Sequence, residues 1–308
     1  NIDSAPQSDA PQQNPLKVYN LADDFVEFYD ETIDLPLSER REIFKTTVAS
    51  QFPDFYNFER FADQNQTLEE ARSDYDQKIE ASIKEFSDIR ARYVTKVDQF
   101  DLNLSDYTKS FESHFPDLDI NYKIYFVHSL GEMDGGTRDF YDRYYLVFGA
   151  DGMVRYHDAQ DYSKEGPFFH HELFHVYHSD FLKGCSDLWC SIWAEGLATY
   201  VARTLNPSAS NSELLLNTPP GMVQKVDDNL LANFLDLKSR LDSPEDGDYR
   251  ALISNNGGSD QLPSRRGYYL GYLIAEEIGK SYSLHDIAQM PSHQVKPIFD
   301  RTLSTLIN

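Results

Sequence analysis

The 308-residue chain is poor in positive charge and in cysteine, and it has no long apolar run. Lys and Arg number 28 against 51 Asp and Glu, which gives a net charge of −23. Binding to phosphate groups needs clustered Lys and Arg, so we expect neither nucleic acid nor an anionic membrane surface as a partner. No apolar run approaches the roughly 18–20 residues of a membrane-spanning helix. The sequence therefore predicts no membrane span.

The chain has two cysteines, Cys185 and Cys190. Their spacing allows either a small disulfide loop or two buried thiols. Residues 1–18 begin with a stretch rich in Ser, Gln, Pro, Ala and Asp, which is typical of a disordered linker. Such a spacer follows a removed signal peptide or lipidated cysteine. We therefore expect an extracytoplasmic protein (periplasmic, lipid-anchored or secreted), the alternative being an ordinary frayed terminus.

The rest of the chain divides into three regions by the spacing of its apolar residues. Forty per cent of the residues are apolar, including 20 Phe and 20 Tyr, which is ample for a sizeable core. Residues 19–115 have helical spacing throughout, with a capping box at Thr67 and Glu70 before a helix over 68–93. Residues 116–205 mix β-rich and helical stretches, and residues 206–308 are predicted to form a C-terminal helical lobe.

The central region begins with predicted strands. These lie near residues 121–128, 143–148 and 153–157, with a Gly-Ala-Asp-Gly hairpin turn between the last two. The segment "GEMDGGTRDF" between the first two is expected to be a loop. Helices are predicted near 167–182, 187–204, 222–241, 267–279, 283–289 and 294–306, and a polar loop at 243–266.

Four of the nine histidines lie in "HHELFHVYH", residues 170–178. This stretch contains the pattern H-E-x-x-H, with His171 and His175 four positions apart. Four helical residues turn about 400°, so both imidazoles project from one face and can bind one zinc ion. Glu172 lies beside the ion, where it can act as general base toward a zinc-activated water. The alternative is a helix whose histidines are structural and bind no metal.

The other two histidines of the stretch do not fit the same ion. His178 lies about 10.5 Å along the helix from His171, so we expect it beside the site or in solvent, and His170 to point away. A third ligand is needed if the fourth position is to hold water. Glu195, in "SIWAEGLATYVAR", follows after a turn that lets an antiparallel helix return past the metal, and Gly196 would allow close helix packing. Glu195 is otherwise an ordinary solvated glutamate.

These residues resemble the gluzincin branch of zinc metallopeptidases. The pattern H-E-x-x-H followed by E-G-x-A is typical of that branch, and "WAEGLATYV" is similar to the W-x-x-E-G-F-A-T-Y-V run of the M1 aminopeptidase group. The resemblance implies that Glu195 is the third zinc ligand. It also implies a tyrosine in Y-x-x-G that stabilises the oxyanion, which is Tyr268 in "YYLG". Tyr268 can alternatively be a core aromatic.

The resemblance is limited to three short motifs between about residues 165 and 280. The G-x-M-E-N segment with which the M1 group captures a free amino terminus is absent, so aminopeptidase specificity is not implied. This short chain is more similar to the small predicted zinc-dependent proteases. In gluzincins the strand before the zinc helix is an edge that pairs with substrate, which implies that role for "YYLVFGAD". Arg138, Arg265 and Arg266 can bind a substrate carboxylate or be surface charges.

We therefore expect an α+β, zincin-like fold in which a small mixed or antiparallel sheet packs on the zinc helix between mainly helical lobes. The expected function is a zinc-dependent peptidase that acts on a peptide or protein substrate. One Zn²⁺ ion is expected on His171, His175 and Glu195, with Glu172 as general base and Tyr268 as oxyanion donor. The alternative is a catalytically silent, zinc-stabilised binding protein on the same fold.

Overall fold

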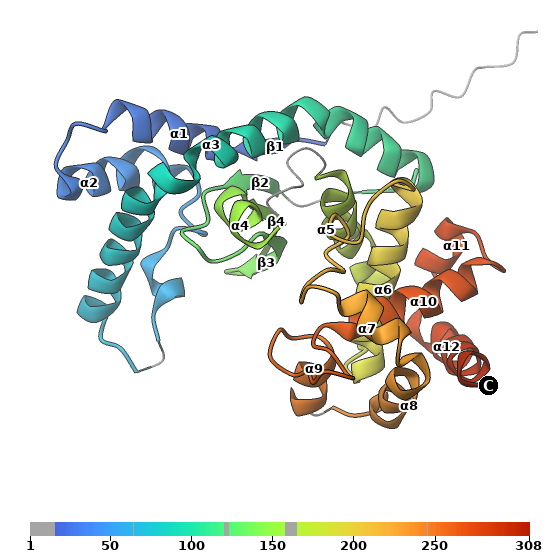
Figure 1. The fold of residues 1–308 in the computed structure, drawn as a ribbon. Helices are drawn as coiled ribbons and strands as arrows, with labels where there is room; N and C mark the ends of the chain where they lie inside the picture. The colour runs from blue at the N-terminus through green and yellow to red at the C-terminus, as the bar shows by residue number, and fades with distance from the viewer. Residues whose placement is uncertain (1–15, 64, 120–122, 158–164, 245) are drawn as a thin grey trace, which may run out of the picture.

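The chain combines many helices with one small sheet, so its fold class is α+β (Figure 1). The computed structural model describes residues 16–63, 65–119, 123–157, 165–244 and 246–308. Most of the predicted linker, residues 1–15, lies outside the described residues. The first strand already begins at Val18, at the end of the segment predicted as linker.

The sheet has four strands in the spatial order β1-β2-β4-β3. Their bounds are Val18–Asn20 for β1, Lys123–Val127 for β2, Gly135–Phe140 for β3 and Arg143–Gly149 for β4. The first three in this order run parallel, and β3 is antiparallel to β4, with Gly136 opposite Val147. Two expectations were wrong here. The segment expected to be a loop forms β3, and "YYLVFGAD" contributes the inner strand β4 and not the edge.

The predicted strand at 153–157 is also wrong, because residues Ala150–Tyr156 form helix α4. A Cβ atom on Gly149 or Gly152 would lie 2.1 or 2.0 Å from the carbonyl oxygen of Met133. These glycines therefore permit a close backbone contact and do not form a hairpin turn. Asp151 secures the helix, since its carboxylate accepts hydrogen bonds from the backbone N–H groups of Ser129 and Gly131.

The N-terminal helices lie on one side of the sheet, and the longest of them crosses it (Figure 1). They are α1 (Leu21–Glu31), α2 (Leu37–Thr47) and α3 (Leu68–His114), with short 3₁₀ turns at Ala49–Gln51 and Phe58–Phe61. The capping box at Thr67 is confirmed, but the helix continues well past residue 93. In its second half Phe100 stacks on Phe126 of β2 and packs on Phe148 of β4. These contacts join α3 to the sheet.

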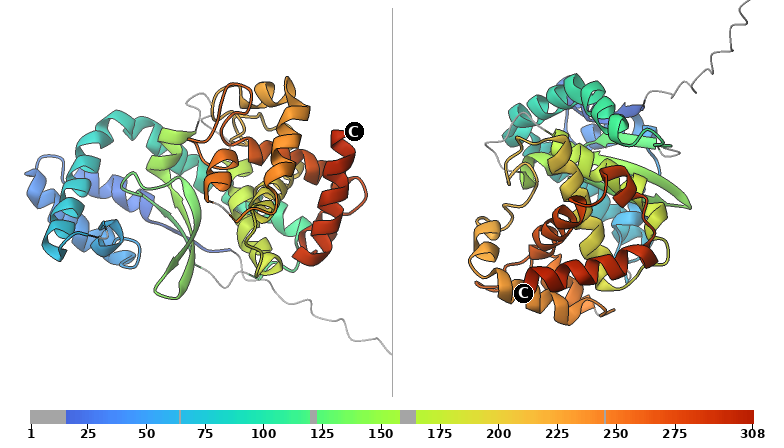
Figure 2. Two further views of the ribbon diagram at one scale, coloured as in Figure 1. Left: turned by 90° about the horizontal axis from the view of Figure 1, so that it is seen from below. Right: turned by 90° about the vertical axis from the view of Figure 1, so that its right-hand side faces the viewer.

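The remaining helices gather on the other side of the sheet, as the left view of Figure 2 shows. They are α5 (Gly166–His178), α6 (Leu188–Leu205), α7 (Met222–Asp227), α8 (Leu230–Arg240), α9 (Asp246–Leu252), α10 (Arg266–Gly279), α11 (Leu284–Ala288) and α12 (Ser292–Ile307). A 3₁₀ turn at Ser179–Leu182 follows α5. The single helix predicted over 222–241 is broken into α7 and α8, and the predicted polar loop contains α9.

Helix α5 lies between the sheet and the C-terminal helices. Its residues Phe168 and Phe169 both pack on Phe148 of β4, with ring centroids 5.9 and 5.7 Å away. Beyond α5, a disulfide between Cys185 and Cys190 closes the connection to α6, which decides between the two states that the cysteine spacing allowed. No helix of the described part of the chain is long and apolar enough to cross a membrane.

Candidate metal centre

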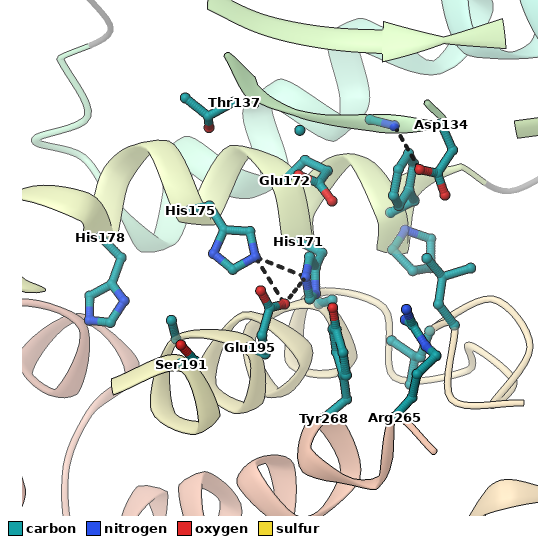
Figure 3. A pocket seen from close by; sticks show the side chains of 18 of the residues that line it. Asp134, Thr137, His171, Glu172, His175, His178, Ser191, Glu195, Arg265 and Tyr268 are labelled. Carbon is teal, nitrogen blue, oxygen red and sulfur yellow. Dashed lines mark hydrogen bonds and ion pairs between the residues drawn. The ribbon is translucent and has the colours of Figure 1, made fainter. Parts of the chain in front are cut away.

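Two histidines of α5 face the same cavity. His171 and His175 are half-buried, and their Nε2 atoms are 3.0 Å apart (Figure 3). On the opposite side of α5, Phe169 is buried against Phe148 of the sheet and Phe100 of α3. This burial fixes the rotation of the helix, so that both imidazoles turn away from the core.

The carboxylate of Glu195, on α6, completes the group. Its Oε2 atom is 3.2 Å from Nε2 of His171 and 3.3 Å from Nε2 of His175. Tetrahedral zinc with bonds of about 2.0–2.1 Å holds its ligands about 3.3 Å from one another. The three atoms thus form a triangle of the size that a zinc ion requires. It is the one such group of three His, Cys, Asp or Glu side chains found among the described residues.

His175 and Glu195 stabilise each other's charged forms. Burial acts to lower the pKa of His175, but the Glu195 carboxylate outweighs it and raises this pKa to about 9. Burial likewise acts to raise the pKa of Glu195, and the two imidazoles outweigh it and lower that pKa. An anionic carboxylate beside two imidazoles suits a divalent cation, which must displace the proton held between them.

Glu172 reaches into the cavity from the same helix but does not belong to the triangle (Figure 3). Its carboxylate faces the edge strand β3, since a Cβ atom on Gly136 would lie 3.9 Å from its Oε2. Burial, with a contribution from Glu195, raises the pKa of Glu172, although the two imidazoles oppose the shift. A carboxylate with a raised pKa is a better proton acceptor. Glu172 is therefore a candidate proton acceptor beside the triangle.

Tyr268 stands on the other side of the triangle, in the first turn of α10. Its ring stacks on His171 at a centroid distance of 6.4 Å, and its hydroxyl points into the cavity (Figure 3). Its neighbours differ, because the hydroxyls of Tyr269 and Tyr272 donate to the carboxylates of Asp227 and Glu276. Of the three tyrosines, Tyr268 is the one that faces the site.

The approach of α10 to α6 depends on two glycines. A Cβ atom on Gly196 would lie 2.2 Å from the carbonyl carbon of Gly271, so the helices touch through their backbones there. The close packing expected at Gly196 is therefore confirmed. Because Glu195 precedes this contact and Tyr268 lies one turn before it, the contact sets the distance between them.

The cavity above these residues has a volume of about 560 Å³. Its walls come from strand β3, helices α5, α6, α9 and α10, the segment between α6 and α7, and the residue before α10. They include Gly135, Gly136, Thr137, Pro167, Phe168, Ser191, Leu214, Leu215, Tyr249 and Arg265. This volume lies in the usual range for sites that bind small molecules or short peptide segments.

The flanking histidines are set apart from the triangle. His170 points away, as expected, and its ring nitrogens contact the carbonyl oxygen of Tyr107 (2.9 Å) and the side-chain amide of Asn206 (2.8 Å). His178 is buried and stacks on Phe174, so the alternative that placed it in solvent is wrong. Burial lowers the pKa of His170 to about 4 and that of His178 to about 3.

The sequence patterns missed a series of polar side-chain contacts that supports the site. Asp134, just before β3, lies 3.3 Å from Nε2 of His157, whose Nδ1 is 3.2 Å from Glu165. Glu165 precedes α5 and forms a buried ion pair with Lys96 of α3. These residues come from separate segments, so no spacing marked them. This series of polar contacts links α3 to the start of α5 and to the edge strand β3.

No protein-family model matches the chain, and no curated protein and no solved structure matches it either. What the site can do therefore has to be inferred from its own geometry and chemistry.

Proposed function

We propose that the protein is a zinc-dependent peptidase with a zincin-like fold and a gluzincin-type site. The observation that carries the proposal is the triangle of His171, His175 and Glu195, whose ligand atoms are 3.0–3.3 Å apart. Two imidazoles and one carboxylate form the donor set of catalytic zinc sites, which keep a fourth position open. The site opens into a cavity that is large enough for a short peptide segment.

The chain supplies the remaining groups that hydrolysis needs. Zinc, when bound, would polarise the scissile carbonyl and make water more acidic. Glu172 is in place to accept the proton of the attacking water and to pass it to the leaving amine. The Tyr268 hydroxyl, on the opposite side of the site, would donate a hydrogen bond to the oxyanion. Burial raises the pKa of Tyr268, which keeps its proton available for that bond.

A peptide is the substrate class that the surrounding backbone favours. Strand β3 is bonded to β4 along one side, and its other side is the edge of the described sheet. Its residues Gly135, Gly136 and Thr137 line the cavity next to Glu172. An extended peptide that pairs with this edge would pass over the metal triangle. The edge strand that pairs with substrate would therefore be β3. It would not be "YYLVFGAD", for which the resemblance implied this role.

We also propose that the protein works outside the cytoplasm. The disulfide between Cys185 and Cys190 supports this location, because structural disulfides persist in oxidising compartments and are rare in the cytosol.

Digestion of a mixed peptide library, read by mass spectrometry, tests the proposed function. We expect cleavage that stops when a chelator removes the metal and returns on addition of zinc. Full zinc occupancy without any cleavage would contradict the peptidase and favour a silent, zinc-stabilised binding protein. Absence of bound zinc, measured by elemental analysis, would contradict both.

A further inference from the structure

The wall of the cavity holds one strongly basic side chain among the described residues, Arg265. The acidic groups around it are the carboxylates of Asp134, Glu172, Glu195 and Glu213. A guanidinium is charged at all physiological pH values. The guanidinium of Arg265 would therefore attract an anionic group into this otherwise acidic cavity beside the candidate metal site.

The other two candidate arginines are already engaged. Arg266 is buried, forms an ion pair with Asp236 and donates to the carbonyl oxygens of Ala251 and Pro263. Arg138, on β3, lies 3.7 Å from Glu132 and donates to the carbonyl oxygen of Thr137. Both have structural partners, so the expectation that either binds a substrate carboxylate is not supported.

Arg265 has no carboxylate partner within the described part of the chain. Its guanidinium lies over the ring of Tyr268, 4.2 Å from the centroid, and its Nε atom is buried without a hydrogen-bond acceptor. A buried donor that has no acceptor costs stability. That cost is removed when a ligand supplies the acceptor.

The backbone holds Arg265 in this position. Its φ angle is +59°, in the left-handed region that non-glycine residues adopt only at an energetic cost. The anchored side chain of Arg266 follows directly and starts α10. Figure 3 shows the result: the side chains of Arg265 and Tyr268 lie side by side and extend from α10 toward α5.

We propose that Arg265 binds a carboxylate of the substrate, so that the enzyme selects peptides with a carboxylate near the cleaved bond. This inference rests on the proposed peptidase function and deepens it. The planar fork of a guanidinium matches a carboxylate with two parallel hydrogen bonds. Arg265 stacks on Tyr268, and the ring of Tyr268 lies beside His171. A carboxylate bound to Arg265 would therefore lie close to the metal triangle. The carboxylate is either the C-terminus of the peptide or an Asp or Glu side chain.

Matched peptides test the inference and show whether Arg265 binds a C-terminal or a side-chain carboxylate. One pair differs only in a free or amidated C-terminus, and a second pair differs only in Asp or Glu against Asn or Gln near the cleaved bond. For wild-type enzyme with zinc, we expect kcat/KM to fall roughly 10- to 100-fold in the pair that removes the bound carboxylate. Arg265→Gln should lose the same factor on the carboxylate peptide and then no longer distinguish the two members of the pair.

Two further variants control for charge and geometry. Arg265→Lys keeps the charge but not the fork and should retain part of the preference. Arg301→Gln removes one charge from an exposed position on α12 and should keep the full preference. Circular dichroism and zinc content confirm that each variant is folded and loaded.

The inference and the proposed function fail in different ways. Equal losses for Arg265→Gln on the carboxylate and neutral peptides would overturn the inference, as would a wild type without preference in either pair. If wild-type enzyme cleaves no peptide, the proposed function is contradicted, and this inference with it.

Discussion

The four histidines of helix α5 lie in two kinds of environment. On the cavity face, His171 and His175 direct their Nε2 atoms toward Glu195. His170 faces Tyr107 and Asn206, and His178 lines the cavity about one turn beyond His175; both are buried, and burial lowers their pKa values to about 4 and about 3. Beside Glu195, the pKa of His175 is instead raised to about 9. A histidine-rich stretch is therefore not one site, and what each ring can do depends on the residues that face it.

Removal of a histidine of the triangle should have the largest effect. We expect His175→Ala to lower zinc affinity more than about 100-fold, because two of the three ligands cannot hold the ion as tightly. Competition with a fluorescent chelator measures the affinity. His178→Leu, three positions along the same helix, is the matched control and should bind zinc as the wild type does. Equal zinc affinity in both variants would remove the distinction between the histidines of the triangle and the buried ones.

The contact of α6 with α10 should come next in size. Gly196→Ala places a methyl group 2.2 Å from the carbonyl carbon of Gly271, which we expect to lower the free energy of unfolding by about 1–3 kcal/mol. Urea denaturation measures this change. Gly247→Ala is the control, since its Cβ meets no atom within 4 Å and alanine favours a helix. A Gly196→Ala variant as stable as Gly247→Ala would show that the helices do not depend on this contact.

The smallest expected effect concerns acid stability and His178. Because burial lowers its pKa to about 3, the folded state resists protonation, whereas the unfolded chain takes up a proton below about pH 6.5. The contribution of neutral His178 is thus fully present above that pH and is lost as the pH falls toward 3.

The comparison with His178→Leu isolates this contribution. Between pH 7 and pH 5, wild type should lose on the order of 1–2 kcal/mol more free energy of unfolding than the variant. Urea denaturation of both metal-free proteins at each pH measures the difference. Parallel losses in the two proteins would show that His178 is not held neutral in the folded state.

Sequence spacing predicted the elements of the site better than those of the sheet. The four-residue step from His171 to His175 places both rings on one helix face by geometry alone, and a helix returning after a short turn brings Glu195 back to them. By contrast, β3 was missed because Gly135 and Gly136 have little intrinsic preference for a strand. Their conformation is set by pairing with β4, a contact between segments that no local pattern contains.

Sequence patterns also could not predict that adjacent residues of one type lie in different environments. Arg265 and Arg266 are adjacent, yet one faces the cavity and the other is buried on Asp236. The difference arises from the left-handed backbone of Arg265 at the start of α10. Similarly, Gly149 and Gly152 suggest a hairpin turn until their contact with Met133 is known.

We propose that Glu172 performs the proton transfer at a zinc site formed by other residues. The most direct test is to measure zinc content and peptide cleavage in one preparation of Glu172→Gln. We predict one zinc ion per chain, as in wild type, and a kcat lowered roughly 10²- to 10⁴-fold, because the amide cannot accept the proton. Cleavage at the wild-type rate with zinc bound would show that Glu172 is not the general base.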